Sequence, residues 1–340
     1  MRKRPGPPLL ALSFAIFAAP DLARAQPEPC SPEASVSPCF DADALWMPTH
    51  ATHFVTLRSA RPFTAEASTL LLATGFALEP VTLVVPAPAP EGREVHVVRA
   101  TTTVTLGVGF GLGEGFGTFA ELPFVPYQEG TGVEGVTSQH APPLGSAAVR
   151  DPRVGVDWTA FGRRPSDPVA LAARVELAPP FGDEALLAGS PSVTLAPGLT
   201  VEGLADRVAF GADASLRLRS AVDFGSVRKG SEVVLGLGTS VRLLASPLLR
   251  VGVEGWLRPG LAGTPPGAGA GAVDLPAEWL ASSVLAWDPD AAFSLAVAAG
   301  SGLPLSKGPS PSGESEAYAG VTAPSFRALV SLRFTPSGSE

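Results

Sequence analysis

The chain is poor in the side chains that build active sites and metal centres. It has 340 residues, of which two are cysteine, four are histidine and two are tyrosine. His50 and His53 are three positions apart, which places them on opposite faces of an extended chain and makes them a poor metal pair. His96 and His140 have no serine or carboxylate placed to act with them. The sequence therefore predicts no metal site, no cofactor and no enzymatic activity.

Long hydrophobic runs are also missing, although 45% of the residues are hydrophobic. A membrane-spanning helix needs about 20 apolar residues, and the apolar run at residues 9–19 is too short. It follows basic residues at positions 2–4 and precedes an A-x-A site at 23–25, which is typical of a secretory signal peptide. Residues 1–25 carry four basic residues and one acidic residue, so their removal takes the formal net charge from −8 to −11. An exported chain this acidic is not expected to bind nucleic acid.

The two cysteines lie close together behind the predicted signal peptide. Cys30 and Cys39 are an even pair at short spacing in an exported chain, which predicts one disulfide formed in an oxidising periplasm. The residues just before Cys30 lack the small and apolar character that a lipoprotein would show there. We expect residues 26–66 to form a periplasmic N-terminal extension.

An alternation of apolar and polar residues is the dominant pattern of the remaining chain. In Arg207–Arg219 every even position is apolar and every odd position is small or charged, which places the two sets on opposite faces of a strand. Similar segments occupy 68–78, 96–108, 116–125, 151–162, 168–178, 192–203, 207–218, 231–243, 248–259, 277–287, 291–301 and 325–334. Their recurrence behind a signal peptide predicts an all-β, antiparallel transmembrane β-barrel of about 12 strands over 67–335, followed by a tail at 336–340. A weaker segment at 51–60 would make 14 strands if it paired with a second, unrecognised one.

The connections between these segments alternate in length. From residue 151 onward, short connections at 162–167, 204–206, 246–247 and 288–290 alternate with long ones at 179–190, 219–230, 259–276 and 302–324. Outer-membrane barrels alternate tight periplasmic turns with long external loops, whereas a soluble sandwich has no reason to keep this order. If the same alternation holds toward the N-terminus, residues 109–115 form a periplasmic turn and residues 79–95 and 126–150 form external loops.

The charged side chains of the strands are expected to face the lumen, because an arginine facing lipid at mid-depth costs about 2–4 kcal/mol. The predicted lumen-facing residues are Arg99, Glu121, Arg153, Asp157, Arg174, Glu176, Arg207, Asp213, Arg217, Arg219, Glu232, Arg242, Arg250, Glu254, Arg258, Arg327 and Arg333. Arginine outnumbers carboxylate in this set, which predicts a basic interior. Two interpretations stay open: the arginines pair with carboxylates and fill a narrow barrel, or unpaired arginines line an aqueous pore that favours anions.

Aromatic residues supply two further signals. Trp279 and Trp287 share the apolar face of one segment, roughly 26 Å apart along a strand, as expected for two interfacial aromatic girdles. The last segment alternates apolar and polar residues and carries Phe326 and Phe334 on its apolar face. This pattern resembles the C-terminal signal for barrel assembly, although six residues follow Phe334.

Several short motifs are punctuated by glycine, proline and aromatic residues. They are Asp43–Trp46, Leu122–Gly130, Leu177–Asp183 and Ala323–Arg327. With them the chain resembles the N-terminal barrel portion of OmpA-family outer-membrane proteins from GC-rich myxobacterial genomes. The resemblance implies an outer-membrane location and a barrel fold. Members of that family typically continue into a periplasmic peptidoglycan-binding domain, which we do not expect here because the sequence stops soon after Phe334.

These patterns together predict a barrel in the outer membrane that acts as a passive channel or transporter for small polar solutes, anions among them. Two alternatives stay open: a structural or surface-interaction barrel with a plugged lumen, and a soluble exported all-β binding protein. The expected partners are outer-membrane lipid, the barrel assembly machinery and small polar solutes.

Overall fold

The computed structural model describes residues 30, 36–63, 68–85, 93–134, 136, 143–164, 166–263, 275–286, 293–305, 319–321 and 323–336. Residues 1–25, the predicted signal peptide, lie outside this part of the chain.

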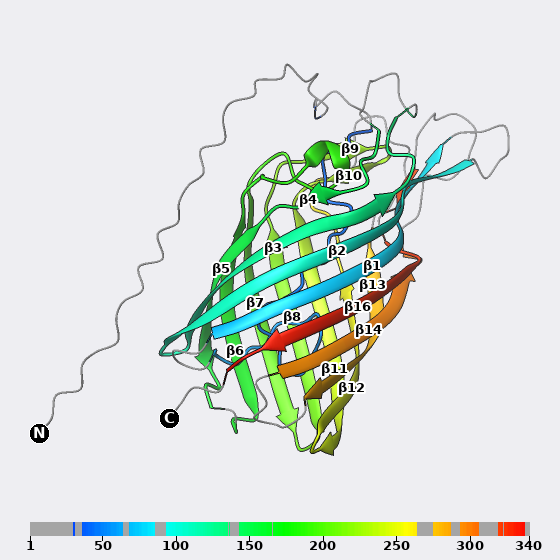
Figure 1. Cartoon of the computed structure of the whole chain (residues 1–340). Helices are drawn as coiled ribbons and strands as arrows, with labels where there is room; N and C mark the ends of the chain where they lie inside the picture. The colour runs from blue at the N-terminus through cyan, green and yellow to red at the C-terminus, as the bar shows by residue number, and fades with distance from the viewer. Residues whose placement is uncertain are drawn as a thin grey trace, which may run out of the picture.

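Twelve long strands form the wall of a closed antiparallel barrel (Figure 1). They are β1 (Ser68–Val85), β2 (Arg93–Gly113), β3 (Phe116–Glu129), β5 (Arg153–Phe161), β6 (Val169–Ala178), β7 (Thr194–Ala205), β8 (Val208–Arg217), β11 (Glu232–Ala245), β12 (Leu248–Leu257), β13 (Ala277–Ala286), β14 (Phe293–Leu303) and β16 (Phe326–Phe334). Each strand pairs with the next, and β1 closes the barrel by pairing with both β2 and β16. The predicted fold class and strand number are confirmed. Residues 51–60 do not form a strand of the barrel.

The two ends of the barrel differ as the alternation of loop lengths predicted. At one end the strands join through tight turns, such as the β2–β3 turn, where Gly113, Glu114 and Gly115 all have positive φ. At the other end lie the short strands β4 (Ala148–Val149), β9 (Val222–Phe224), β10 (Val227–Lys229) and β15 (Ala319–Val321) and the 3-10 helix η1 (Glu184–Leu186) (Figure 1). We call these the periplasmic and the external end. Within the described residues, no helix has the length and apolar character of a membrane span.

The outer face of the wall is apolar and exposed. The exposed apolar side chains on the strands include Leu72, Leu106, Leu122, Val154, Val156, Val175, Leu199, Val201, Phe210, Leu235, Leu237, Val253, Val297, Val330 and Leu332. They alternate with buried polar side chains such as Glu121, Arg153 and Glu254. A soluble protein does not expose an apolar surface of this extent. The alternative of a soluble sandwich is therefore wrong, and the fold is that of an outer-membrane barrel.

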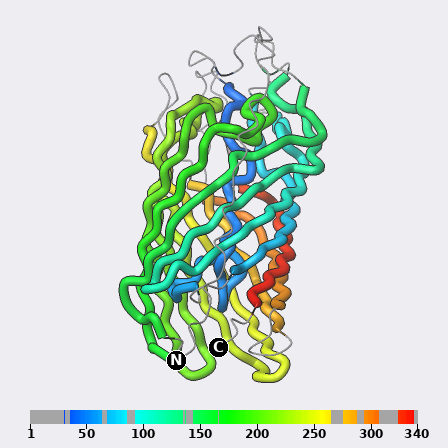
Figure 2. The backbone as a smooth tube through the Cα atoms, turned by 60° about the vertical axis from the view of Figure 1, so that its left-hand side comes forward, coloured from blue at the N-terminus to red at the C-terminus, as the bar shows by residue number. Residues whose placement is uncertain are grey.

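Residues 36–63, which we call the lumen segment, run through the inside of the barrel (Figure 2). At the external end Val36 forms a β-bridge with Phe224, and the N–H of Ala42 donates to the carbonyl of Leu187. At the periplasmic end Phe63 packs under the β2–β3 turn. The expectation of a periplasmic extension over 26–66 is therefore wrong for these residues. A barrel of eight strands is filled by its own side chains, but twelve strands enclose a wider lumen, and the chain fills it with its own N-terminal part.

The predicted disulfide joins Cys30 to Cys39, with Cα atoms 5.6 Å apart. It lies at the external end, because Phe40, the residue after Cys39, packs edge-on against Phe224 with ring centroids 5.0 Å apart. The disulfide therefore ties the start of the lumen segment where that segment meets the external strands.

Candidate functional site: the occupied lumen

Glycines on the inner face of the wall let the lumen segment approach the strand backbones. A Cβ at Gly211 would lie 2.6 Å from the Phe54 ring, and one at Gly236 would lie 2.6 Å from the Leu57 side chain. Such distances leave no room for a larger residue, so Phe54 and Leu57 sit directly against β8 and β11. The alternation that places small residues on the inner face thus also shapes the lumen for this segment.

Two wall carboxylates bind the lumen segment directly. Glu254 on β12 accepts hydrogen bonds from the N–H groups of Val55 (2.8 Å), Thr56 (2.7 Å) and Leu57 (3.2 Å), and from the Thr56 hydroxyl (2.6 Å). Glu121 on β3 accepts from the N–H (2.9 Å) and the hydroxyl (2.8 Å) of Thr49. Backbone donors inside a barrel lack strand partners, so these carboxylates satisfy groups that would otherwise be costly to bury.

Two arginines of β16, a strand that lies between β3 and β12 in the closed wall, also bind the segment. Arg327 on β16 pairs with Asp43 of the segment (2.9 Å) and with Glu278 on β13 (2.6 Å). Arg333, also on β16, donates to the carbonyls of Pro48 (3.2 Å) and Val55 (3.0 Å). The segment is therefore held by charged groups from opposite sides of the barrel.

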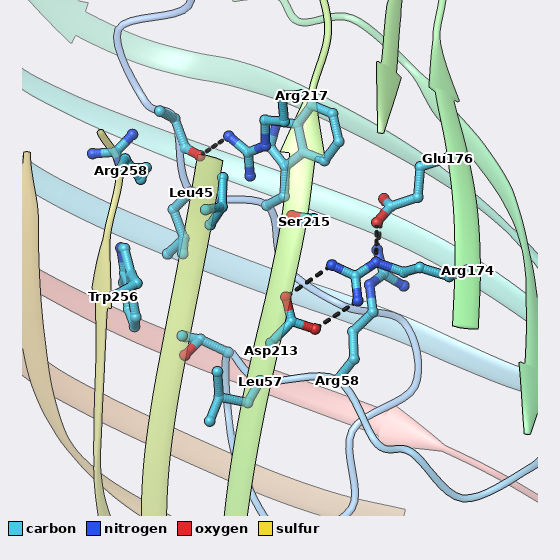
Figure 3. A pocket seen from close by; sticks show the side chains of 15 residues that line it. Leu45, Leu57, Arg58, Arg174, Glu176, Asp213, Ser215, Arg217, Trp256 and Arg258 are labelled. Carbon is cyan, nitrogen blue, oxygen red and sulfur yellow. Dashed lines mark hydrogen bonds and ion pairs between the residues drawn. The ribbon is translucent and has the colours of Figure 1, made fainter. Parts of the chain in front are cut away.

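Arginines of the lumen segment also form ion pairs with carboxylates of the wall. Arg58 pairs with Glu176 on β6 at 2.7 Å, and Arg61 pairs with Glu202 on β7 at 2.7 Å (Figure 3 shows Arg58 and Glu176). Glu176 also binds Arg174 of its own strand at 2.8 Å. These contacts form a network in which wall and segment carry charges of both signs.

Trp46 of the segment lies between two wall arginines. The guanidinium carbons of Arg217 and Arg153 are 3.9 and 4.9 Å from the centre of the indole ring. Both distances are within the range of cation–π attraction. The indole therefore stabilises two buried cations that come from different sides of the lumen.

A small polar cavity remains between the segment and the wall (Figure 3). It has a volume of about 50 Å³ and is lined by residues 44–46 and 56–58 and by side chains of β6, β8, β11 and β12. That volume accommodates about three to five water molecules. Among its lining groups, the Nε atoms of Arg217 and Arg258 and the indole nitrogen of Trp256 have no hydrogen-bond partner within the described residues.

The predicted lumen-facing residues lie on the inner face with two exceptions, Arg207 and Arg99. Glu121, Arg153, Asp157, Arg174, Glu176, Asp213, Arg217, Arg219, Glu232, Arg242, Arg250, Glu254, Arg258, Arg327 and Arg333 point inward or into ion pairs inside the barrel. Arg207 lies exposed at the periplasmic rim, directly before β8.

Arg99 does not face the lumen, because its side chain is 70% exposed and lies 4.0 Å from Glu129. The pairing of β1 with β2 is irregular between Leu78 and Val81, and Glu79 there has a positive φ. Arg99 lies opposite this irregularity, which shifts the alternation of faces by one position. The prediction that Arg99 faces the lumen is therefore wrong.

The predicted basic interior is also wrong, because two inward carboxylates were not recognised. Glu202 on β7 and Glu278 on β13 are buried and bind arginines. Nine arginines of the wall face the lumen, namely Arg153, Arg174, Arg217, Arg219, Arg242, Arg250, Arg258, Arg327 and Arg333. They are balanced by eight carboxylates, namely Glu121, Asp157, Glu176, Glu202, Asp213, Glu232, Glu254 and Glu278. The alternation itself contained the signal, since Glu278 precedes the outward Trp279 and Glu202 follows the outward Val201.

The aromatic predictions have mixed outcomes. Trp279 is 41% exposed on the outer face and donates to the Ser301 hydroxyl at 3.1 Å, whereas Trp287 lies outside the described residues. Phe326 is exposed on the outer face, and the Phe334 ring packs on Phe293 with centroids 4.5 Å apart. The role of these two phenylalanines in assembly stays a prediction.

The comparisons with known proteins identify the fold. No protein-family model matches the chain, and no curated protein matches it. Among solved structures, the crystal structure of the COG4313 outer membrane channel from Pseudomonas putida F1 superposes with a TM-score of 0.54 at 13% identity, covering 80% of this chain and 96% of that chain. The KdgM porin gives a TM-score of 0.40 at 9% identity, covering 77% and 98%. The first likeness shows a shared barrel fold, and the second is too weak to add to it.

Proposed function

We propose that this protein is a passive outer-membrane channel for small polar solutes and that the lumen segment closes it. The structure with which it shares its fold is described as an outer membrane channel, which supports the proposal. The proposed partners are outer-membrane lipid, the barrel assembly machinery and the solutes themselves. Kinship with the OmpA-family barrels of myxobacteria is likewise a proposal.

The observation that carries the proposal is the way the lumen segment is held. The twelve strands complete their hydrogen-bonded ladder without it, because β1 pairs on both sides with strands of the wall. In the lumen proper the segment is bound by wall side chains such as Glu254, Glu121 and Arg333, and within the described residues its one β-bridge is at Val36. The segment can therefore leave its place without opening the sheet, and the wall that remains encloses a polar lumen wider than its own side chains fill.

A filled structural barrel is the second candidate, and the density of buried ion pairs favours it. Breaking a buried pair by losing one partner costs about 3–5 kcal/mol, and Arg58, Arg61 and Asp43 each form such pairs with the wall. If these pairs never open together, the barrel conducts nothing and the loops carry its function.

Single-channel recording from the full chain in planar bilayers distinguishes the two candidates. Glu254→Gln weakens contacts between wall and segment, whereas Asp213→Asn weakens an ion pair with Arg174 and a hydrogen bond from Thr200, both of which are wall residues. A channel closed by the segment opens more often in Glu254→Gln than in the wild type, with unchanged unit conductance, while Asp213→Asn resembles the wild type. Silence from all three heat-modifiable, β-rich preparations would refute the channel and support the filled barrel.

A further inference from the structure

A row of arginines crosses three neighbouring strands near the periplasmic end of the lumen. Arg242 on β11 pairs directly with Arg250 on β12, and the N–H of Arg242 donates to the carbonyl of Arg207 at the start of β8. Directly paired residues on antiparallel strands carry their side chains on the same face, with Cβ atoms about 4.5–5.5 Å apart. For Arg242 and Arg250 this is the lumen face, because the lumen-facing Glu254 follows Arg250 by four positions on β12 and therefore lies on the same face of the strand.

The described part of the chain gives this row no counter-charge. Within the described residues, no carboxylate forms an ion pair with Arg207, Arg242 or Arg250, whereas Arg174, Arg217 and most other lumen-facing arginines of the wall are paired. Like charges placed directly opposite each other across a pair of strands destabilise that pair. An unpaired buried charge is more costly still.

Arg250 of this row and the nearby Ser240 are deeply buried and have polar atoms without a hydrogen-bond partner in the described residues. Arg250 is only 7% exposed, and its Nε and one Nη atom form no hydrogen bond within the described part of the chain. Ser240 precedes Arg242 by two positions on the same face, is 2% exposed, and its hydroxyl is likewise unsatisfied there. The inner face thus presents several unsatisfied donors close together.

The neighbouring carboxylates already accept hydrogen bonds from other groups. Glu202 on β7 accepts from His53 (3.0 Å), Ser59 (3.0 Å) and Arg61 (2.7 Å). Glu254 is occupied by the backbone of the lumen segment. Among the described residues, no carboxylate is therefore left to compensate the charge of the row.

We propose that Arg242, Arg250 and Ser240, with Arg207 at the rim, form a binding site for a small oxyanion of the phosphate or carboxylate type. A guanidinium donates two parallel hydrogen bonds to such an anion, so two arginines and a hydroxyl match several oxygens at once. Chloride offers no such directional match. Arg242 and Arg250 lie closer to the periplasmic β11–β12 turn than Glu254, and they have no printed contact with the lumen segment, so the anion can bind while the segment is in place. Binding does not depend on conduction; the role of the site in solute passage rests on the proposed channel function.

The test is isothermal titration calorimetry of the purified full chain with inorganic phosphate, in chloride buffer of constant ionic strength. We expect saturable binding to the wild type and a loss of at least about tenfold in affinity in the double variant Arg242→Gln/Arg250→Gln. Arg164→Gln is the control, because it removes an arginine charge from an exposed position in the 162–167 turn at the same end of the barrel. It should bind phosphate like the wild type.

Three results would overturn the site: no binding to the wild type, unchanged affinity in the double variant, or an equal loss in Arg164→Gln. Ser240→Ala tests the site without changing its charge and should weaken phosphate binding several-fold while chloride titration shows no difference. The outcome is separable from that of the channel proposal. Phosphate binding by a silent barrel would sustain the site and refute the channel, and conduction without phosphate binding would do the reverse.

Discussion

Replacing Glu254 by glutamine should release the lumen segment from the wall. The carboxylate accepts four hydrogen bonds from Val55, Thr56 and Leu57. Glutamine keeps one oxygen and turns an NH₂ group toward the donors on the other side. Since hydrogen bonds to a charged group contribute about 1.5–3 kcal/mol and neutral ones about 0.5–1.5 kcal/mol, the exchange should cost docking of the segment about 2–4 kcal/mol. This corresponds to a roughly 30- to 1000-fold rise in the undocked population.

The rate of thiol alkylation at Leu57→Cys measures that population. Leu57 is buried against Gly236, and the native cysteines are joined in a disulfide and do not react. The alkylation rate should rise by the same factor when Glu254→Gln is added and should stay near its starting value when Asp213→Asn, which touches only wall residues, is added. An unchanged rate in the Glu254→Gln background would refute the assigned role of this carboxylate. An equal rise in both backgrounds would mean that the whole barrel, rather than the segment, has loosened.

Three other perturbations test separate parts of the account. Leu235→Arg places a charge on the lipid face, where Leu235 is 41% exposed. Exposing an arginine to lipid costs about 2–4 kcal/mol, so this variant should fail to assemble. A heat-modifiable gel band like that of the wild type would contradict the assignment of faces. Gly211→Val pushes a side chain into the Phe54 ring. It should lower the free energy of unfolding by about 1–3 kcal/mol in urea titrations. An unchanged midpoint would contradict the close approach of Phe54 to β8. Reduction of the Cys30–Cys39 disulfide, whose cysteines are nine positions apart, should cost about 2.5 kcal/mol in the same assay, and coincident curves with and without reductant would argue against its stabilising role.

The wall of the barrel was predictable from sequence because the bilayer imposes a period of two on every strand. All twelve strands and the alternation of turns and loops follow from that constraint. Faces were misassigned where local geometry breaks the period, as at Arg99, which lies opposite a bulge that no residue pattern announces. Glu278 was predictable in principle, because its strand neighbour Trp279 was already assigned to the outer face.

The position of the lumen segment was not predictable in the same way. Its contacts are individual side chains meeting backbone groups far away in sequence, such as Glu254 with Val55, 199 positions apart. No periodicity records such contacts, so an alternating stretch like 51–60 reads as an extra strand. The row of arginines became visible only when strand register placed Arg242 opposite Arg250.

The most direct test of the closed channel is to lock the lumen segment to the wall and then release it. A Cβ at Gly107 would lie 2.6 Å from the Thr49 hydroxyl oxygen, so Thr49→Cys together with Gly107→Cys places two sulfurs where a disulfide forms. In one planar bilayer, the oxidised pair should be silent, and adding reductant should produce steps of the wild-type conductance. Wild-type protein given the same reductant controls for loss of the native disulfide. Equal conductance before and after reduction would contradict the claim that residues 36–63 close the lumen.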